Sequence, residues 1–212
     1  MIGRKKKAYV REVDVDYFTD ANLAVQLSVL EEDKVRGNDE TEIGYGDVSV
    51  RAMATIFKKI RFETHENIGS GPIYLPEEEL HTSSAWISLN KELSEFGHDR
   101  LEEGLIGTSQ ALKHIAPLFV MCDPSDVYVV PHVKAAHNEK PTIFFYDRYP
   151  GGIGLSEKIY SGIEEILKQT KQMVKNCQCS DGCPSCIGTD TASIHSKNDV
   201  VKLLDLFLKA AV

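Results

Sequence analysis

Four of the five cysteines lie within ten residues, in the segment CQCSDGCPSC at positions 177–186. Zn²⁺ in structural sites is held by four ligands in a tetrahedron, with Zn–S distances of about 2.3 Å. The two-residue spacing of Cys183 and Cys186 lets both sulfurs approach one ion, and Gly182 permits a turn just before them. Four thiolates leave no open position for water. The segment therefore predicts one structural Zn²⁺ with Cys177, Cys179, Cys183 and Cys186 as its ligands.

Two other roles for these cysteines compete with zinc binding. Disulfides are typical of secreted proteins, and nothing in the sequence indicates secretion; a Cys-x-Cys closure would also be strained. A redox Cys-x-x-Cys pair is expected between a strand and a helix of a thioredoxin-like unit, and residues 183–186 do not follow that pattern. Zinc is preferred, and the redox pair stays as the alternative. Cys122, at the end of an apolar helical stretch, is expected to be a small buried hydrophobe.

The composition of the 212 residues is that of a globular protein, with 42% hydrophobic residues. No apolar run is long enough to span a membrane, and the basic run Arg4–Lys7 is not followed by a signal-peptide stretch. A soluble, cytoplasmic protein without a membrane partner is therefore expected. The formal net charge of −8 opposes long-range attraction to nucleic acid, so any contact with DNA must use a local patch.

Alternating apolar and polar side chains predict that the first ninety residues form antiparallel β-sheet. An acidic connection from Glu31 to Asp47 and a turn at NIGSGP (67–72) are expected to separate strands. In chain order, the expected strands are 9–17, 23–29, 48–62, 73–75 and 80–88.

The remaining residues predict a mixture of helices and a β-hairpin. Apolar spacings of three and four predict a helix over about 100–121, and two short β-branched and aromatic runs predict a hairpin from 127–130 and 142–146. A long helix follows the glycines at 151–154, and a last helix begins at Ser196 with Asp199 as its capping partner. The predicted fold class is thus α+β, with about 1–90 mainly β, about 91–212 mainly α with the hairpin, and the four-cysteine site between the last two helices.

Two further features of the sequence resemble ligand sites. GGIG (151–154) follows a strand and begins a helix, where anions bind, but it lacks a P-loop lysine and a dinucleotide fingerprint. A tight turn is the preferred interpretation, and a phosphate site the alternative. His195, nine residues after Cys186, is either a partner of the metal ligands or a solvated capping group. No Ser-His-Asp grouping or carboxylate pair stands out, so no catalytic residue is assigned.

Four stretches together resemble one family: KKKAYVREVDVDYFTDA (5–21), KKIRFETHENIGSGPIYLPEEELHTSSAWI (58–87), YDRYPGGIGLSEKIY (146–160) and CQCSDGCPSC (177–186). The chain is similar over nearly its whole length to the C-terminal zinc-binding domain of the mitomycin-repair-type superfamily 2 (DEAD/DEAH-box) DNA helicases of bacteria. In that family the domain follows two RecA-like motor lobes, and its four cysteines hold a zinc. The parent proteins are ATP-dependent DNA-unwinding motors that act in repair of crosslinked or adducted DNA.

The resemblance implies that residues 1–212 form one accessory domain of a helicase. Walker A and acidic helicase motifs are absent from this sequence, so no enzymatic activity is expected of the chain by itself. Its abrupt start in a strand-like run after Met1 suggests a fragment of a longer protein. The implied partners are the motor lobes of the same parent chain, DNA in single-stranded form, and a partner nuclease.

Candidate DNA contacts are Lys58, Lys59 and Arg61, which lie between the aromatic residues Phe57 and Phe62. Bases could stack on the aromatic rings while the cations meet the backbone. Strand alternation places Lys59 and Arg61 on one face and Lys58 on the other. A second basic patch is Arg4–Lys7 with Arg11. The rival hypothesis is a stand-alone redox or phosphate-ligand-binding enzyme.

Overall fold

The computed structural model describes residues 10–64, 66–90, 96–188 and 196–209. The chain divides into two compact units. The first contains residues up to 24 together with 52–78, and the second contains 25–51 together with everything from 79 onward. Strands β1 (Tyr17–Gly37) and β2 (Thr41–Arg61) contribute residues to both units.

The first unit is a small antiparallel sheet. It consists of the first half of β1, the second half of β2, and β3 (Asn67–Pro72), which pairs with β2. Lys58 lies opposite Ser70, and the register shifts between Lys59 and Ile60. No residue that the structure describes in this unit is buried, although many of its side chains are apolar. The sheet therefore has no core of its own.

The second unit is built on a sheet in the order β1-β2-β4-β6-β5. Strand β6 (Thr142–Asp147) pairs antiparallel with β4 (Glu78–Leu89) on one side and with β5 (Val127–His132) on the other. Every residue of β6 is buried. This burial explains why its sequence, TIFFYD, is almost continuously apolar instead of alternating.

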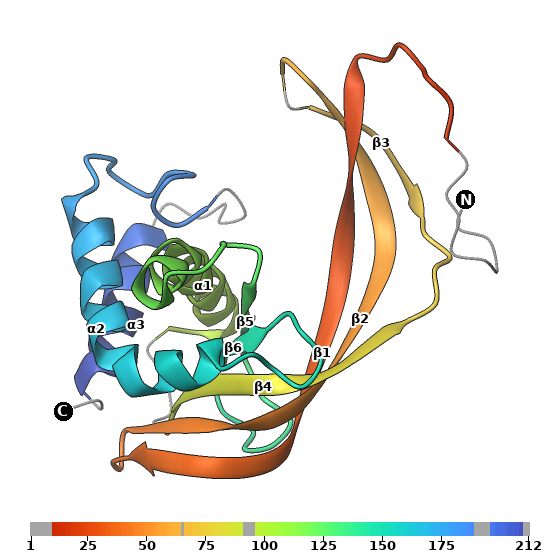
Figure 1. Ribbon diagram of the computed structural model, residues 1–212. Helices are drawn as coiled ribbons and strands as arrows, with labels where there is room; N and C mark the ends of the chain where they lie inside the picture. Colours follow the sequence, from red (N-terminus) through yellow and green to blue (C-terminus); the bar gives the residue numbers. More distant parts are fainter. Residues whose placement is uncertain (1–9, 65, 91–95, 189–195, 210–212) are drawn as a thin grey trace. The chain divides into compact units, whose positions relative to one another are not determined.

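Three helices cover one face of this sheet: α1 (His98–Val120), α2 (Leu155–Asn176) and α3 (Ser196–Lys209) (Figure 1). The main core lies between them and the strands, and it includes Ile87, Phe145 and Leu203. Gly104 brings α1 close to α3, since a Cβ added there would lie 2.7 Å from a methyl carbon of Leu203. The opposite face of the sheet carries a second cluster centred on Trp86 and Phe144.

The structure confirms the α+β class, the three helices and the hairpin, and the cysteine segment lies between α2 and α3. None of the helices in the described part of the chain is both long and apolar enough to cross a membrane.

The predicted connection from Glu31 to Asp47 is wrong, because β1 and β2 are each 21 residues long and run through it. Only a short turn at 38–40 separates them. Asn38 makes this turn, since its Oδ1 accepts hydrogen bonds from the amides of Glu40 and Thr41 at 2.8 and 3.1 Å. Three of the acidic residues that suggested a loop, Glu31, Glu32 and Asp33, are exposed on the edge strand β1.

Three other boundaries differ from the prediction. NIGSGP, predicted as a turn, is strand β3, and its glycines accommodate side chains of β2: a Cβ added at Gly71 would lie 2.8 Å from the Phe57 ring. Residues 10–15 and 73–75, predicted as strands, have no regular structure. The alternation of apolar and polar residues in these two segments does not mark a buried face, because apolar residues such as Val10 and Tyr74 are exposed.

Candidate metal centre

The cysteine segment begins where α2 ends. Cys177 leaves the helix with extended backbone (φ −65°, ψ 131°). The second pair closes a tight turn, in which the amides of Cys186 and Ile187 both donate to the carbonyl of Cys183, at 3.0 and 3.1 Å. Gly182 precedes this turn with φ +128°, and a Cβ at this position would overlap the Ile187 side chain. Cys186 and Ile187 are buried in the main core, so the segment is anchored to the body of the unit.

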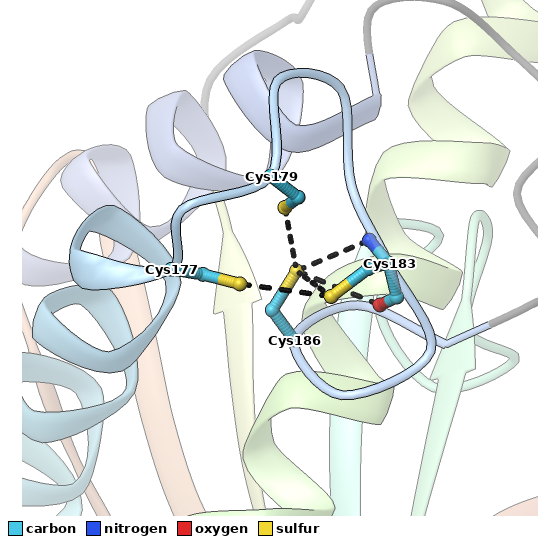
Figure 2. Close-up of side chains that lie close together, drawn as sticks. All are labelled: Cys177, Cys179, Cys183 and Cys186. Carbon is cyan, nitrogen blue, oxygen red and sulfur yellow. Dashed lines mark hydrogen bonds between the residues drawn. The ribbon is translucent and has the colours of Figure 1, made fainter.

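The fold brings the four cysteine sulfurs together (Figure 2). All four lie within 4.8 Å of one another, and three pairs are separated by 3.6 Å: Cys177–Cys183, Cys179–Cys186 and Cys183–Cys186. A tetrahedron with Zn–S bonds of about 2.3 Å has sulfur–sulfur edges of about 3.8 Å. The four sulfurs therefore fit around one Zn²⁺. None of these cysteines forms a disulfide.

The thiols of the cluster differ in acidity. Hydrogen bonding, first from the backbone amide of Cys179 and then from the side chains of Cys179 and Cys183, lowers the pKa of the Cys177 thiol to about 7. Burial raises the pKa of the Cys186 thiol to about 12. Zinc binds thiolates, so an ion held by the Cys186 sulfur would displace the proton of this thiol. The amide of Cys183 is placed to stabilise the resulting thiolate, since it donates to the Cys186 sulfur at 3.3 Å.

The glycine stretch at 151–154 ends in a helix N-terminus that the protein itself caps. The carboxylate of Asp147, which is fully buried, accepts hydrogen bonds from the amides of Ile153, Leu155 and Ser156 at 2.7, 3.1 and 2.8 Å. The Ser156 hydroxyl donates to the same carboxylate. These are the groups that an anionic ligand would need. The geometry thus favours the tight-turn interpretation over a phosphate site.

The candidate DNA contacts lie in the first unit, and two of them have partners within it. Arg61 lies 3.4 Å from Asp16 and 3.7 Å from Glu66, and the Lys59 ammonium lies 5.0 Å from the centroid of the Tyr17 ring. Lys58, which is half-buried opposite Ser70, makes no ion pair or ring contact with the described residues. The structure does not test a DNA contact, so this assignment stays a prediction.

The remaining predicted features are dispersed. Arg4–Lys7 and His195 lie outside the described residues. Cys122 is half-buried against the main core, where burial raises the pKa of its thiol. Asp199, predicted to cap α3, pairs with the Arg100 guanidinium through bonds of 2.6 and 3.1 Å.

One further group of potential metal ligands was not apparent in the sequence. Oxygens of Glu32 and Glu42 and a ring nitrogen of His137 lie within 4.8 Å of one another. The Lys140 ammonium lies 3.9 Å from Glu42 and already supplies a positive charge. Glu32 is exposed. We assign no metal to this group.

An α+β unit that holds four cysteine sulfurs at tetrahedral spacing is a zinc-binding domain. Comparison with known proteins agrees, since residues 108–187 match the family described as MZB, the MrfA Zn-binding domain. The chain belongs to this MrfA Zn-binding domain family. One structural zinc, as predicted, is thereby confirmed.

Relatives place this domain in larger proteins. The uncharacterized ATP-dependent helicase YprA of Bacillus subtilis (strain 168) is 56% identical over 200 residues, which are 94% of this chain and 27% of the helicase. The uncharacterized protein MJ1572.1 of Methanocaldococcus jannaschii is 37% identical over 76 residues, covering 34% of this chain and 68% of that protein. A crystal structure described as the DUF1998 helicase MrfA bound to DNA shares 55% identity and a TM-score of 0.73, covering 95% of this chain and 27% of that one. The chain thus spans about a quarter of the length of the helicases that it matches.

Proposed function

We propose that residues 1–212 form a zinc-stabilised accessory domain of an ATP-dependent DNA repair helicase, which supports strand engagement and unwinding by motor lobes in the same parent protein. The observation that carries this proposal is the four-sulfur cluster in a chain 56% identical to part of a helicase. The match to a helicase structure bound to DNA supports a role close to the strand. The proposed setting is the cytoplasm, and the chain by itself is proposed to have no catalytic activity.

The zinc ligands in this proposal are Cys177, Cys179, Cys183 and Cys186. Their sulfur–sulfur distances fit one tetrahedral ion, and the segment joins the end of α2 to the core. Purified protein should contain one zinc per chain by metal analysis, and Cys183→Ser should lose it. The matched control is Cys122→Ser, which changes a cysteine outside the cluster and should keep the zinc. Full zinc content in the Cys183 variant would contradict the ligand assignment.

The first unit is proposed to be a docking surface for the rest of the helicase. Its described residues are all exposed or half-buried, and they include large apolar side chains such as Leu23, Phe62 and Tyr74, which are 56%, 55% and 89% exposed. A three-stranded sheet needs a covered apolar face to be stable. Acidic residues outnumber basic ones eight to four among the described residues of this unit, which favours a protein surface over a long stretch of phosphates.

Any DNA contact in this unit is proposed to be local, through Lys58, Lys59 and Arg61. Single-stranded DNA is the proposed form of the nucleic acid, and a partner nuclease is a further proposed partner. Because Arg61 already pairs with two carboxylates, we expect weak binding that depends strongly on salt.

The test is to reverse Lys59 and Arg61 to Glu in the parent helicase and to measure strand binding, ATP hydrolysis and unwinding separately. Lys202→Glu, a charge reversal at an exposed lysine of α3, is the control for a change of charge elsewhere on the chain. The double variant should weaken strand binding while the control does not. Equal binding and unwinding in all three proteins would leave the sheet as a docking surface only and remove DNA contact from this unit.

The rival function, a redox or phosphate-binding enzyme, receives less support from the geometry. Asp147 occupies the helix N-terminus that a phosphate would use. The pairwise sulfur distances of 3.6 Å suit four ligands of one ion. A metal-free protein with a reversible disulfide would favour the rival.

A further inference from the structure

The zinc-binding segment is held by a lysine that is not adjacent to it in the sequence. The Lys197 ammonium donates hydrogen bonds to the backbone carbonyls of Cys177 and Cys179, at 2.6 and 2.7 Å. Lys197 is the second residue of α3 and is half-buried. It therefore contacts the backbone of both cysteines in the Cys-x-Cys half of the cluster.

The same end of α3 holds a third carbonyl of the segment. The Lys197 amide and the Ser196 hydroxyl both donate to the carbonyl of Asp181, each at 3.0 Å. Carbonyls at 177, 179 and 181 thus all point toward the first turn of α3. Hydrogen bonds within the segment itself hold the other half, the turn from Cys183 to Cys186. The Cys-x-Cys half has the hydrogen bond from the Cys179 amide to the Cys177 thiol and, in addition, these contacts with α3.

Electrostatics favours a cation at this place. Four thiolates around Zn²⁺ carry a net charge of −2, and the neighbouring carbonyl oxygens are also negative ends of dipoles. The Lys197 ammonium, which lies between the carbonyls of Cys177 and Cys179, offsets the negative charge of the zinc–thiolate cluster and the negative ends of these two dipoles. Hydrogen bonds from a charged donor are stronger than neutral ones. Groups that orient metal ligands typically change metal affinity by about 10–100-fold when they are removed.

We propose that Lys197 is a positioning residue that fixes Cys177 and Cys179 on the zinc, so that α3 controls how slowly the metal is released. This proposal rests on the ligand set proposed above. It assigns a metal-retention role to a residue eleven positions beyond the last cysteine. The side chain touches no sulfur in the structure; it acts through the two carbonyls.

The experiment measures zinc transfer from the zinc-loaded chain to excess chromogenic chelator. Lys197→Met keeps the aliphatic stem and removes the ammonium, and it should release zinc about tenfold faster or more. Lys197→Arg keeps a cation and should restore part of the slow release. Lys202 is an exposed lysine of the same helix, and Lys202→Met should release zinc at the same rate as the unmodified protein. A release rate for Lys197→Met equal to that of Lys202→Met would overturn the proposal.

A second readout separates ligand positioning from a general loss of helix stability. After replacement of zinc by Co²⁺, the visible absorption spectrum reports the arrangement of the four sulfurs. Lys197→Met should alter this spectrum at temperatures where circular dichroism shows the helices intact, and an unchanged spectrum would count against the proposal. If Lys197→Met does not fold, Lys197→Gln, which can still donate to one carbonyl, replaces it in both measurements. Failure of the ligand set itself would appear differently, as absence of zinc from the unmodified protein.

Discussion

Replacing Asp147 by Asn should strongly destabilise the second unit. The two carboxylate oxygens of Asp147 accept three backbone amides and one hydroxyl at the start of α2. An Asn of the same shape keeps one accepting oxygen and turns an NH₂ group toward the other two donors. With its oxygen toward the amides of Ile153 and Leu155, Asn leaves the buried Ser156 amide without an acceptor, while the Ser156 hydroxyl still donates to the carbonyls of Ser83 and Phe145 at 3.1 Å.

The expected loss follows from these contacts. A buried donor without an acceptor, here the Ser156 amide, costs about 1–3 kcal/mol. Removing the negative charge from a helix N-terminus adds about 0.3–1 kcal/mol. We expect the free energy of unfolding to fall by about 2–3 kcal/mol, which is a substantial part of the roughly 5–15 kcal/mol typical of folded proteins.

Urea unfolding followed by circular dichroism, at saturating zinc, would measure this difference. Asp39→Asn is the matched control, because Asp39 is exposed in the turn between β1 and β2. The same change of side chain at this position should shift the free energy of unfolding by less than about 0.5 kcal/mol. A loss below about 1 kcal/mol for the Asp147 variant would show that these hydrogen bonds do not hold the start of α2.

Two further outcomes test the metal centre. Chelation of zinc should lower the melting temperature and make α3 sensitive to protease, because α3 donates hydrogen bonds to three carbonyls of the cysteine segment (177–186). An unchanged digestion pattern in the metal-free protein would oppose a structural role for the metal. Zinc affinity should rise with pH, because zinc must displace the proton of Cys186 (pKa about 12) at every pH tested and also that of Cys177 below pH 7. Competition titrations should show zinc binding weakening as the pH falls, and more steeply below pH 7, where the Cys177 thiol also carries a proton, whereas pH-independent affinity would contradict the proton displacement.

The parts of this protein that sequence reasoning predicted are local in the chain. The four cysteines fall within ten residues, so their spacing alone indicates one metal site. The helices α1, α2 and α3 show apolar residues at spacings of three and four along a single segment. Neither inference requires knowledge of which distant segments meet.

The missed features depend on contacts between distant segments. The sequence alone gives Lys197 no role, because its partner carbonyls belong to the cysteine segment, twenty residues earlier at Cys177. Asp147 is likewise only the last residue of a predicted strand, and its role depends on the chain turning back so that the Ile153 amide donates to it. The full length of β1 was not predicted from the sequence, for a related reason. Its charged residues suggested a loop, but an edge strand tolerates them, and Lys34 pairs with Glu157 of α2 at 2.6 Å.

The closeness of the four cysteines in the chain has a consequence for the order of folding. Closing a loop costs about 0.6 kcal/mol more for each doubling of its length, and the cluster needs only loops of two to nine residues. Pairing of β4 with β6 joins residues more than fifty positions apart, such as Ser88 and Thr142. The zinc segment can therefore capture its ion on a chain whose sheet has not yet formed. In this order the metal-loaded segment forms first, and α3 completes it later by donating hydrogen bonds to the carbonyls of Cys177 and Cys179.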